Sequence, residues 1–212
     1  MRATTTLPTN YRHQATLDLS KSRLAFVGAI VSGIVLLVLV GWLLLQFAHL
    51  VRPAAFEGPG LGDILTMTTE GNTSITLPLQ PILVALVLVT VIHELVHGLF
   101  YWRFAGQRPR FGIKGPSFYV AAPPEVFFPR DQYLIVGIAP LVLLTLAGLL
   151  LMIVVPMAVL PTLMLFVAFN AAGAAGDLLM FARLLRFSSD TLMQDRDTGV
   201  RVYGPEKVHR AT

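Results

Sequence analysis

The chain has 212 residues, of which 55% are hydrophobic and only 13% are charged, against roughly 25% charged in an average soluble domain, so a water-soluble globule is not expected. Because the chain has no cysteine, disulfides, thiolate metal ligands and cysteine nucleophiles are excluded. The net charge of +4 does not indicate a nucleic-acid partner, because the basic residues stand beside long apolar runs, where they act as topology signals.

A polar segment, residues 1–23, precedes a first apolar run at 24–51. That run is too long for the core of a signal peptide, and no convincing small-residue cleavage site follows it, so we predict a retained membrane helix. Residues 52–80 are rich in Gly, Pro and Thr and are expected to form a loop. A second apolar run, 81–102, begins at Pro81, a residue suited to the first turn of a helix.

Residues 103–130 combine basic residues with Pro, Gly and aromatic residues, and Ser117 to Ala122 are predicted as a short strand or a re-entrant segment. Two more apolar runs, 133–155 and 157–182, are separated by a connection too short for a domain. The sequence therefore predicts an all-α membrane protein with about four transmembrane helices. A single membrane-embedded domain, residues 24–182, would lie between cytoplasmic tails at 1–23 and 183–212.

The charged residues are unevenly distributed. All 16 Lys and Arg lie outside the apolar runs, and the five polar segments hold 4, 1, 5, 0 and 6 of them in chain order. Under the positive-inside rule, this alternation places both termini and residues 103–130 in the cytoplasm. Of the 12 acidic residues, only Glu94 and Asp177 lie well inside an apolar run. Carboxylates are costly inside a bilayer, so these two are candidates for function.

The second apolar run contains the motif His93-Glu94-Leu95-Val96-His97. Two histidines four residues apart lie on one face of a helix, so their ring nitrogens can bind one metal ion while the glutamate between them reaches a metal-bound water. The alternative is a polar cluster of these three ionisable side chains that only holds helices together.

A catalytic zinc site needs a third protein ligand and an open position for water. At about 1.5 Å rise per residue, the two histidines lie roughly 9–15 Å from Arg103, and Asp177 lies roughly 9 Å from Arg183. Asp177 is therefore at a similar depth and is the expected third ligand. Alternatively, Asp177 pairs with an arginine at the membrane surface, and Glu125 and Asp131 are weaker candidates for the ligand.

Asp177 follows a run of small residues that extends from Asn170 to Gly176. Small residues let membrane helices approach closely, which a short Asp side chain needs in order to reach a metal held by a neighbouring helix. Asn170 lies two turns before Asp177 on nearly the same face, where its amide could hold a substrate carbonyl or a developing oxyanion. An interhelical hydrogen bond is an equally good interpretation of Asn170.

These features resemble the membrane-embedded zinc metalloproteases of the site-2 protease class, and more closely the small zincin peptidases grouped as a domain of unknown function. The resemblance implies that His93, His97 and Asp177 bind zinc, that Glu94 is the general base and that Asn170 positions the substrate. The site-2 group has a proline after the Asn and an Asp-Gly pair, which this chain lacks. The resemblance covers residues 81–180 and rests on the His-Glu-x-x-His motif, the basic segment after it, Ala139-Pro140, and Asn170 to Asp177.

We therefore expect an intramembrane zinc endopeptidase of a prokaryotic cell membrane, whose partners are the lipid bilayer and a membrane-spanning or membrane-adjacent peptide substrate. Water activated by Zn²⁺ would attack a peptide carbonyl, and Glu94 would pass its proton to the leaving amine. Residues 110–128 could pair as an edge strand with an unwound substrate. The competing hypothesis is a non-catalytic metal-binding adaptor, chaperone or transporter subunit. The enzyme is favoured because a structural zinc site is closed by four protein ligands, and only three good candidates are visible.

Overall fold

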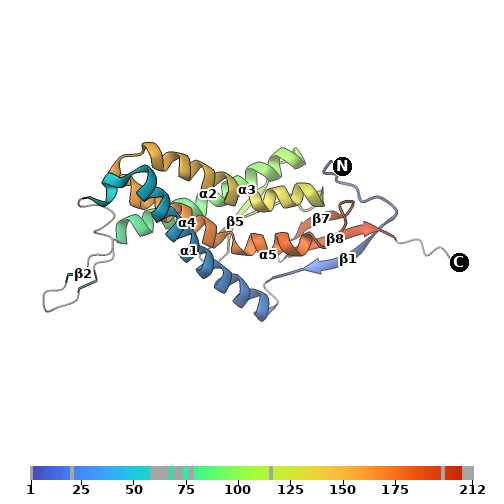
Figure 1. Ribbon diagram of the computed structural model, residues 1–212. Helices are drawn as coiled ribbons and strands as arrows, with labels where there is room; N and C mark the ends of the chain where they lie inside the picture. The colour runs from blue at the N-terminus through green and yellow to red at the C-terminus, as the bar shows by residue number, and fades with distance from the viewer. Residues whose placement is uncertain are drawn as a thin grey trace.

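The computed structural model describes residues 2–19, 22–57, 67–68, 74–75, 79–114, 117–196 and 199–206 (Figure 1). The predicted loop at 52–80 lies largely outside these residues; its described parts are a 3-10 turn at Pro53–Phe56 and the strands β2 (Met67–Thr68) and β3 (Ser74–Ile75). Four spans are long and apolar enough to cross a membrane, and their ends lie within three residues of the prediction. They are α1 (Arg23–Val51), α2 (Leu79–Ala105), α3 (Arg130–Val154), and Met157–Leu184, which contains α4 (Leu160–Gly173) and α5 (Ala175–Leu184).

The fourth span is predicted as one continuous helix, but the structure divides it at Ala174. A short 3-10 turn, Met157–Val159, precedes α4, and a new helix begins at Ala175. As a result, Asp177 lies in the first turn of α5. A carboxylate is favoured there because the unpaired N–H groups at a helix N-terminus carry partial positive charge.

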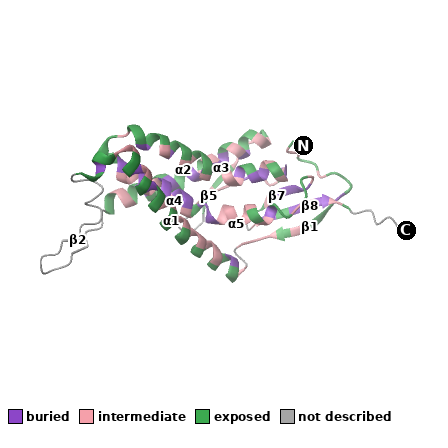
Figure 2. Ribbon diagram, in the orientation of Figure 1, coloured by how far each residue is buried: buried purple, intermediate pink, exposed green. Residues whose placement is uncertain are grey.

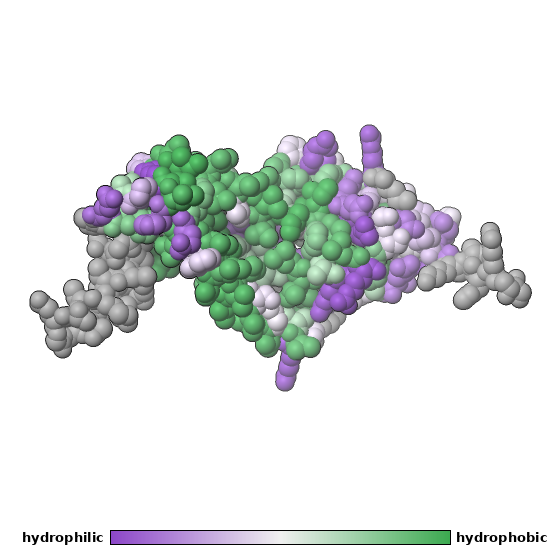
Figure 3. All heavy atoms as spheres, in the orientation of Figure 1, coloured by the Kyte–Doolittle hydropathy of each residue, from purple (hydrophilic) through white to green (hydrophobic). Residues whose placement is uncertain are grey.

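The helices present apolar side chains outward rather than hiding them. Val38 on α1 is 66% exposed and Leu150 on α3 is 67% exposed. Figure 2 shows exposed residues along much of α1. Figure 3 shows that apolar residues dominate the middle of the visible face, while hydrophilic residues gather near the strands β7 (Leu192–Arg196) and β8 (Gly199–Pro205). A water-soluble domain rarely exposes apolar patches of this extent. The surface therefore fits a multi-pass membrane protein.

Small residues bring the helices close together. A Cβ added at Gly33 of α1 would lie 3.1 Å from the carbonyl oxygen of Ala172 on α4, and one added at Gly148 of α3 would collide with Val167 of α4. Close approach through small residues is the usual way in which membrane helices pack. It places α4 against α1 and α3, and α4 also contacts α2.

The all-α prediction is wrong in one respect, because the two polar ends of the chain form an antiparallel sheet together with a short strand from the segment before α3. Its strand order is β1-β8-β7-β6, with Tyr11 opposite Pro205 and Leu17 opposite Val200. The buried Val200 and Val202 alternate with less buried neighbours, a period of two typical of a half-buried strand. The strands are β1 (Tyr11–Leu17), β6 (Phe127–Pro129), β7 (Leu192–Arg196) and β8 (Gly199–Pro205).

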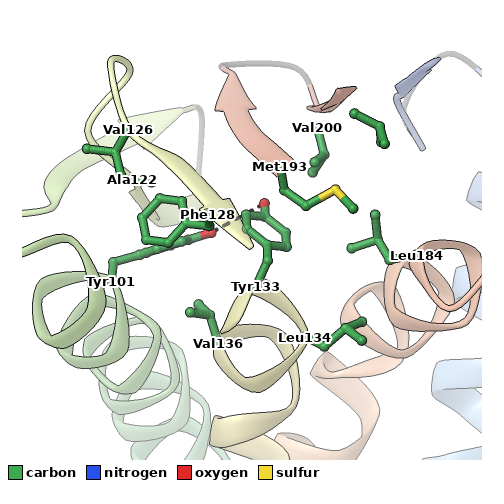
Figure 4. Packing of buried hydrophobic residues seen from close by; sticks show 11 residues of the cluster. Tyr101, Ala122, Val126, Phe128, Tyr133, Leu134, Val136, Leu184, Met193 and Val200 are labelled. Carbon is green, nitrogen blue, oxygen red and sulfur yellow. Dashed lines mark hydrogen bonds between the residues drawn. The ribbon is translucent and has the colours of Figure 1, made fainter. Parts of the chain in front are cut away.

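A core of buried side chains attaches this sheet to the ends of the helices (Figure 4). Tyr101 of α2 and Tyr133 of α3 point toward Phe128 of β6. Met193 of β7 and Leu184 of α5 lie on the opposite side of Tyr133 from Phe128. The sheet thus covers one end of the helical bundle.

A separate hairpin lies against α2. Its strands are β4 (Arg110–Lys114) and β5 (Ser117–Ala121), with Phe111 opposite Val120. The predicted strand at Ser117–Ala122 is therefore present. A Cβ added at Gly98 of α2 would lie 3.1 Å from Phe111 and 3.3 Å from Val120, so glycine allows the hairpin to rest directly on the helix.

Candidate metal centre

Three side chains that could bind a metal meet between α2 and α5. His93 and His97 are one turn apart on α2, and both are buried, while the side chain of Asp177 is 31% exposed. The distance from Nε2 to Oδ2 of Asp177 is 3.2 Å for His93 and 3.6 Å for His97. One ligand atom from each residue lies within 4.8 Å of the others, so the structure brings together the three residues that the sequence pairs by depth.

This geometry fits a zinc ion. Two ligand atoms bound at about 2.0–2.1 Å to one tetrahedral ion lie about 3.3 Å apart, close to both separations between histidine nitrogen and carboxylate oxygen. Two imidazoles and one carboxylate also form a donor set found in catalytic zinc sites, where the fourth position is open. The residues present therefore fit a zinc ion.

Hydrogen bonds behind the two rings orient them for this role. Nδ1 of His97 lies 2.9 Å from the carbonyl oxygen of Val136, which can only accept, so Nδ1 donates. Nδ1 of His93 lies 3.0 Å from Oδ1 of Asn170, whose amide nitrogen donates to the carbonyl of Pro140 at 3.2 Å. With the proton on Nδ1, each Nε2 presents its lone pair toward Asp177. Histidines that bind metals are commonly held by such contacts.

Pro140 explains why a carbonyl inside α3 is available to a histidine. In an α-helix the N–H of residue 140 would bond to the carbonyl of residue 136, but proline has no N–H. The Val136 carbonyl is thereby released from that helical bond and instead accepts the Nδ1–H of His97. The proline therefore orients a candidate ligand that it does not contact through its own side chain.

Replacing Pro140 with Ala is expected to weaken zinc binding by about 10- to 100-fold, the usual cost of losing a group that orients a metal ligand. The new N–H at residue 140 would compete with His97 for the Val136 carbonyl. Zinc affinity measured by competition with a chelating dye checks this. The control is Pro161→Ala at the start of α4, where no helical hydrogen bond is interrupted. Wild-type affinity in Pro140→Ala would contradict the role of Pro140.

Asn170 contacts a candidate ligand and a carbonyl of α3. It is fully buried, its oxygen faces Nδ1 of His93 and its nitrogen donates to Pro140. Neither of the two cavities beside the centre has Asn170 among its described lining residues. These contacts are those of the interhelical hydrogen bond that the sequence also allows. Asn170 connects α4 to α2 and α3 and holds His93 from behind.

Glu94 lies beside the centre and is partly buried. Its Oε2 accepts a hydrogen bond of 2.9 Å from the backbone N–H of Val120 on β5. One carboxylate oxygen is therefore held by the hairpin. Because this donor belongs to the backbone, no side-chain pattern in the sequence identifies it.

Two cavities meet at the candidate centre. One, of about 380 Å³, reaches from the centre to the sheet and Asp195, and the other, of about 650 Å³, lies between α2, α4, α5 and β5. Both are lined by Glu94, Tyr119, Gly176 and Asp177. A chain lying across both cavities would pass these residues.

The alternative ligands are not brought to the centre. Glu125 is exposed, and Asp131 is paired with the neighbouring Arg130 at 2.7 Å. In the part of the chain that the structure describes, the candidate metal group contains no acid other than Asp177.

A family model agrees with the chemistry of this site. The family is DUF3267, whose description is "Putative zincin peptidase", and its model matches residues 86–192, half of the chain, including both histidines, Glu94 and Asp177. No curated protein and no solved structure matches the chain. With a match of that extent over the residues that form the candidate centre, the chain belongs to the DUF3267 family.

Proposed function

We propose that this protein is an intramembrane zinc endopeptidase of the site-2 protease type. The observation that carries the proposal is the meeting of His93, His97 and Asp177 at ligand distances, with Glu94 lining the same two cavities. Membership of a zincin peptidase family supports the reaction class.

The roles of the side chains follow from their chemistry. His93, His97 and Asp177 would hold the zinc ion, and Asn170 and the Val136 carbonyl keep the two imidazoles oriented. When bound, zinc lowers the pKa of water and polarises a carbonyl. Glu94 accepts a proton from the attacking water and returns it to the leaving amine.

The position of the site indicates the kind of substrate. His93 and Glu94 lie in the middle of α2, one of four apolar spans. A transmembrane helix hides its carbonyls in its own hydrogen bonds, so the substrate segment must unwind to be cleaved. Such an extended segment could lie across the two cavities, beside the hairpin within residues 110–128.

The proposed topology has both termini and the sheet in the cytoplasm. The distribution of Lys and Arg supports this orientation. Pairing of β1 with β8 also supports it, because both polar ends then lie at the same end of the bundle, as Figure 1 shows. The tails at 1–23 and 183–212 would flank one membrane-embedded domain.

The competing function is a non-catalytic metal-binding membrane protein. A purely structural zinc site is closed by four protein ligands. Among the residues that the structure describes, the group has three, and the carboxylate of Glu94, which is suited to act as a base, lines the adjacent cavity. These features favour the enzyme.

The direct test uses the purified full chain in liposomes with a panel of fluorescently tagged single-span segments. We expect about one zinc per chain, cleavage within the apolar part of a segment, loss of cleavage with a chelator and recovery on adding zinc. Cleavage that persists in a chain shown to contain no metal would contradict a metallopeptidase. Bound zinc without cleavage of any segment, in a chain that retains its fold, would support the competing function.

A further inference from the structure

Two carboxylates from distant parts of the chain bind the same edge of β5. Glu94 of α2 accepts the N–H of Val120 at 2.9 Å, and Asp195 of β7 accepts the N–H of Ala122, the residue after β5, also at 2.9 Å. In an extended strand, residues two apart direct their N–H groups to the same side. Both acids therefore lie along the β5 edge that faces away from β4.

Asp195 is also fixed to the helices. Its Oδ1 accepts a hydrogen bond of 3.4 Å from the hydroxyl of Tyr133, which in turn accepts one of 3.4 Å from Tyr101. Figure 4 shows these two tyrosines reaching toward each other from α3 and α2. Asp195 thus connects the sheet and the hairpin to α3, and through Tyr133 to α2.

Burying the carboxyl group of Asp195 costs free energy, and a purely structural contact would not require that cost. Burial raises the pKa of Asp195 from 3.8 to about 6, although the Ala122 N–H, the Tyr133 and Tyr101 hydroxyls and the charge of Arg110 all oppose the rise. Asp195 and Glu94 both line the cavity of about 380 Å³. Costly carboxyls beside a reaction site are frequently functional.

We propose that Asp195 is a positioning residue for Glu94. By holding Ala122, it fixes the outer edge of β5 so that the N–H of Val120 reaches the carboxylate of Glu94. One oxygen of Glu94 is then engaged by the hairpin, and the other is directed by that contact toward the cavities. Asp195 lies beyond the 86–192 match, so the family resemblance does not include it.

This inference rests on the proposed peptidase function, and its test therefore has two readouts. The first is amide hydrogen exchange of residues 117–122 in the full chain, which reports the strand edge without any substrate. The second is the separation of kcat from KM on a cleaved single-span segment, per bound zinc. The variants are Asp195→Ala and Asp195→Asn, whose amide oxygen can still accept the Ala122 N–H.

The matched control is Gln194→Ala. Gln194 is the buried neighbour of Asp195 on β7 and donates to the carbonyl of Pro124 at 2.8 Å, so it connects the same strand to the loop after β5 without contacting the edge. A residue that only stabilises the sheet would behave like this control.

For Asp195→Ala we expect exchange at Val120 and Ala122 to accelerate at least about 10-fold and kcat to fall roughly 10- to 100-fold at unchanged KM and zinc content, because small misplacements of a catalytic group are costly. Asp195→Asn should restore most of both. Unchanged exchange and kcat in Asp195→Ala, or equal losses in Gln194→Ala, would overturn the proposal. If Asp195→Ala exchanges faster but the wild type cleaves no segment, the contact between Asp195 and Ala122 is supported. That outcome would count only against the peptidase function.

Discussion

Replacing Glu94 with Gln is expected to reduce cleavage by about 10²- to 10⁴-fold, the usual contribution of a general acid–base group. The amide cannot take a proton from water at neutral pH. Its oxygen can still accept the N–H of Val120, so the hairpin should keep its place on α2. Because Glu94 is outside the group of candidate ligands, the variant should bind zinc as the wild type does.

The measurement combines zinc content with kcat on a single-span segment in liposomes. Glu125→Gln is the matched control, since Glu125 is an exposed acid with no place in either cavity. It should retain wild-type activity. Wild-type kcat in Glu94→Gln would remove the proposed mechanism, whereas a parallel loss of zinc would make Glu94 a ligand and not a base.

The helices and the candidate ligands could be predicted from the sequence because both depend on local spacing. Long apolar runs define the spans, and a separation of four residues places His93 and His97 on one helical face. Asp177 could be paired with them because the lengths of two helices place all three at similar depth. These inferences needed no knowledge of how distant segments pair.

The sheet could not be predicted in the same way. Tyr11 pairs with Pro205, so its formation depends on contact between the two ends of the chain. The strands β1, β7 and β8 lie in polar segments of the sequence that resemble solvated tails. Only β8 has clear alternation of buried and exposed positions. In the sequence, Asp195 is one more charge in the polar tail at 183–212, although it lines a cavity beside the candidate centre.

The contacts behind the histidines were only partly accessible from sequence. A proline inside a helix leaves one carbonyl without its helical partner, but the group that binds the Val136 carbonyl depends on how α3 packs against α2. The sequence allows two interpretations of Asn170, and its buried contacts with His93 and Pro140 depend on how three helices pack. A polar residue on a helix face shows that a partner is needed but does not identify it.

Replacing Asp177 with Ala is expected to reduce zinc affinity by more than about 100-fold, because losing even a group that only orients a ligand costs about 10- to 100-fold. The carboxylate is the member of the group that faces both histidine nitrogens, at 3.2 and 3.6 Å, and two imidazoles alone leave a poor zinc site. Cleavage should be lost with the metal. The measurement is zinc affinity in the full chain by competition with a chelating dye.

The control for Asp177→Ala is Asp131→Ala, the other acid that the sequence offered as a ligand. Asp131 is exposed and paired with Arg130, so its loss should leave zinc affinity unchanged. Asp177→Asn separates charge from shape, since the amide preserves the side-chain volume but provides a weaker, neutral oxygen. It should bind zinc less well than the wild type and better than Asp177→Ala. Wild-type affinity in Asp177→Ala would mean that the two histidines hold the metal with a different third ligand, and loss of affinity in Asp131→Ala would identify that ligand.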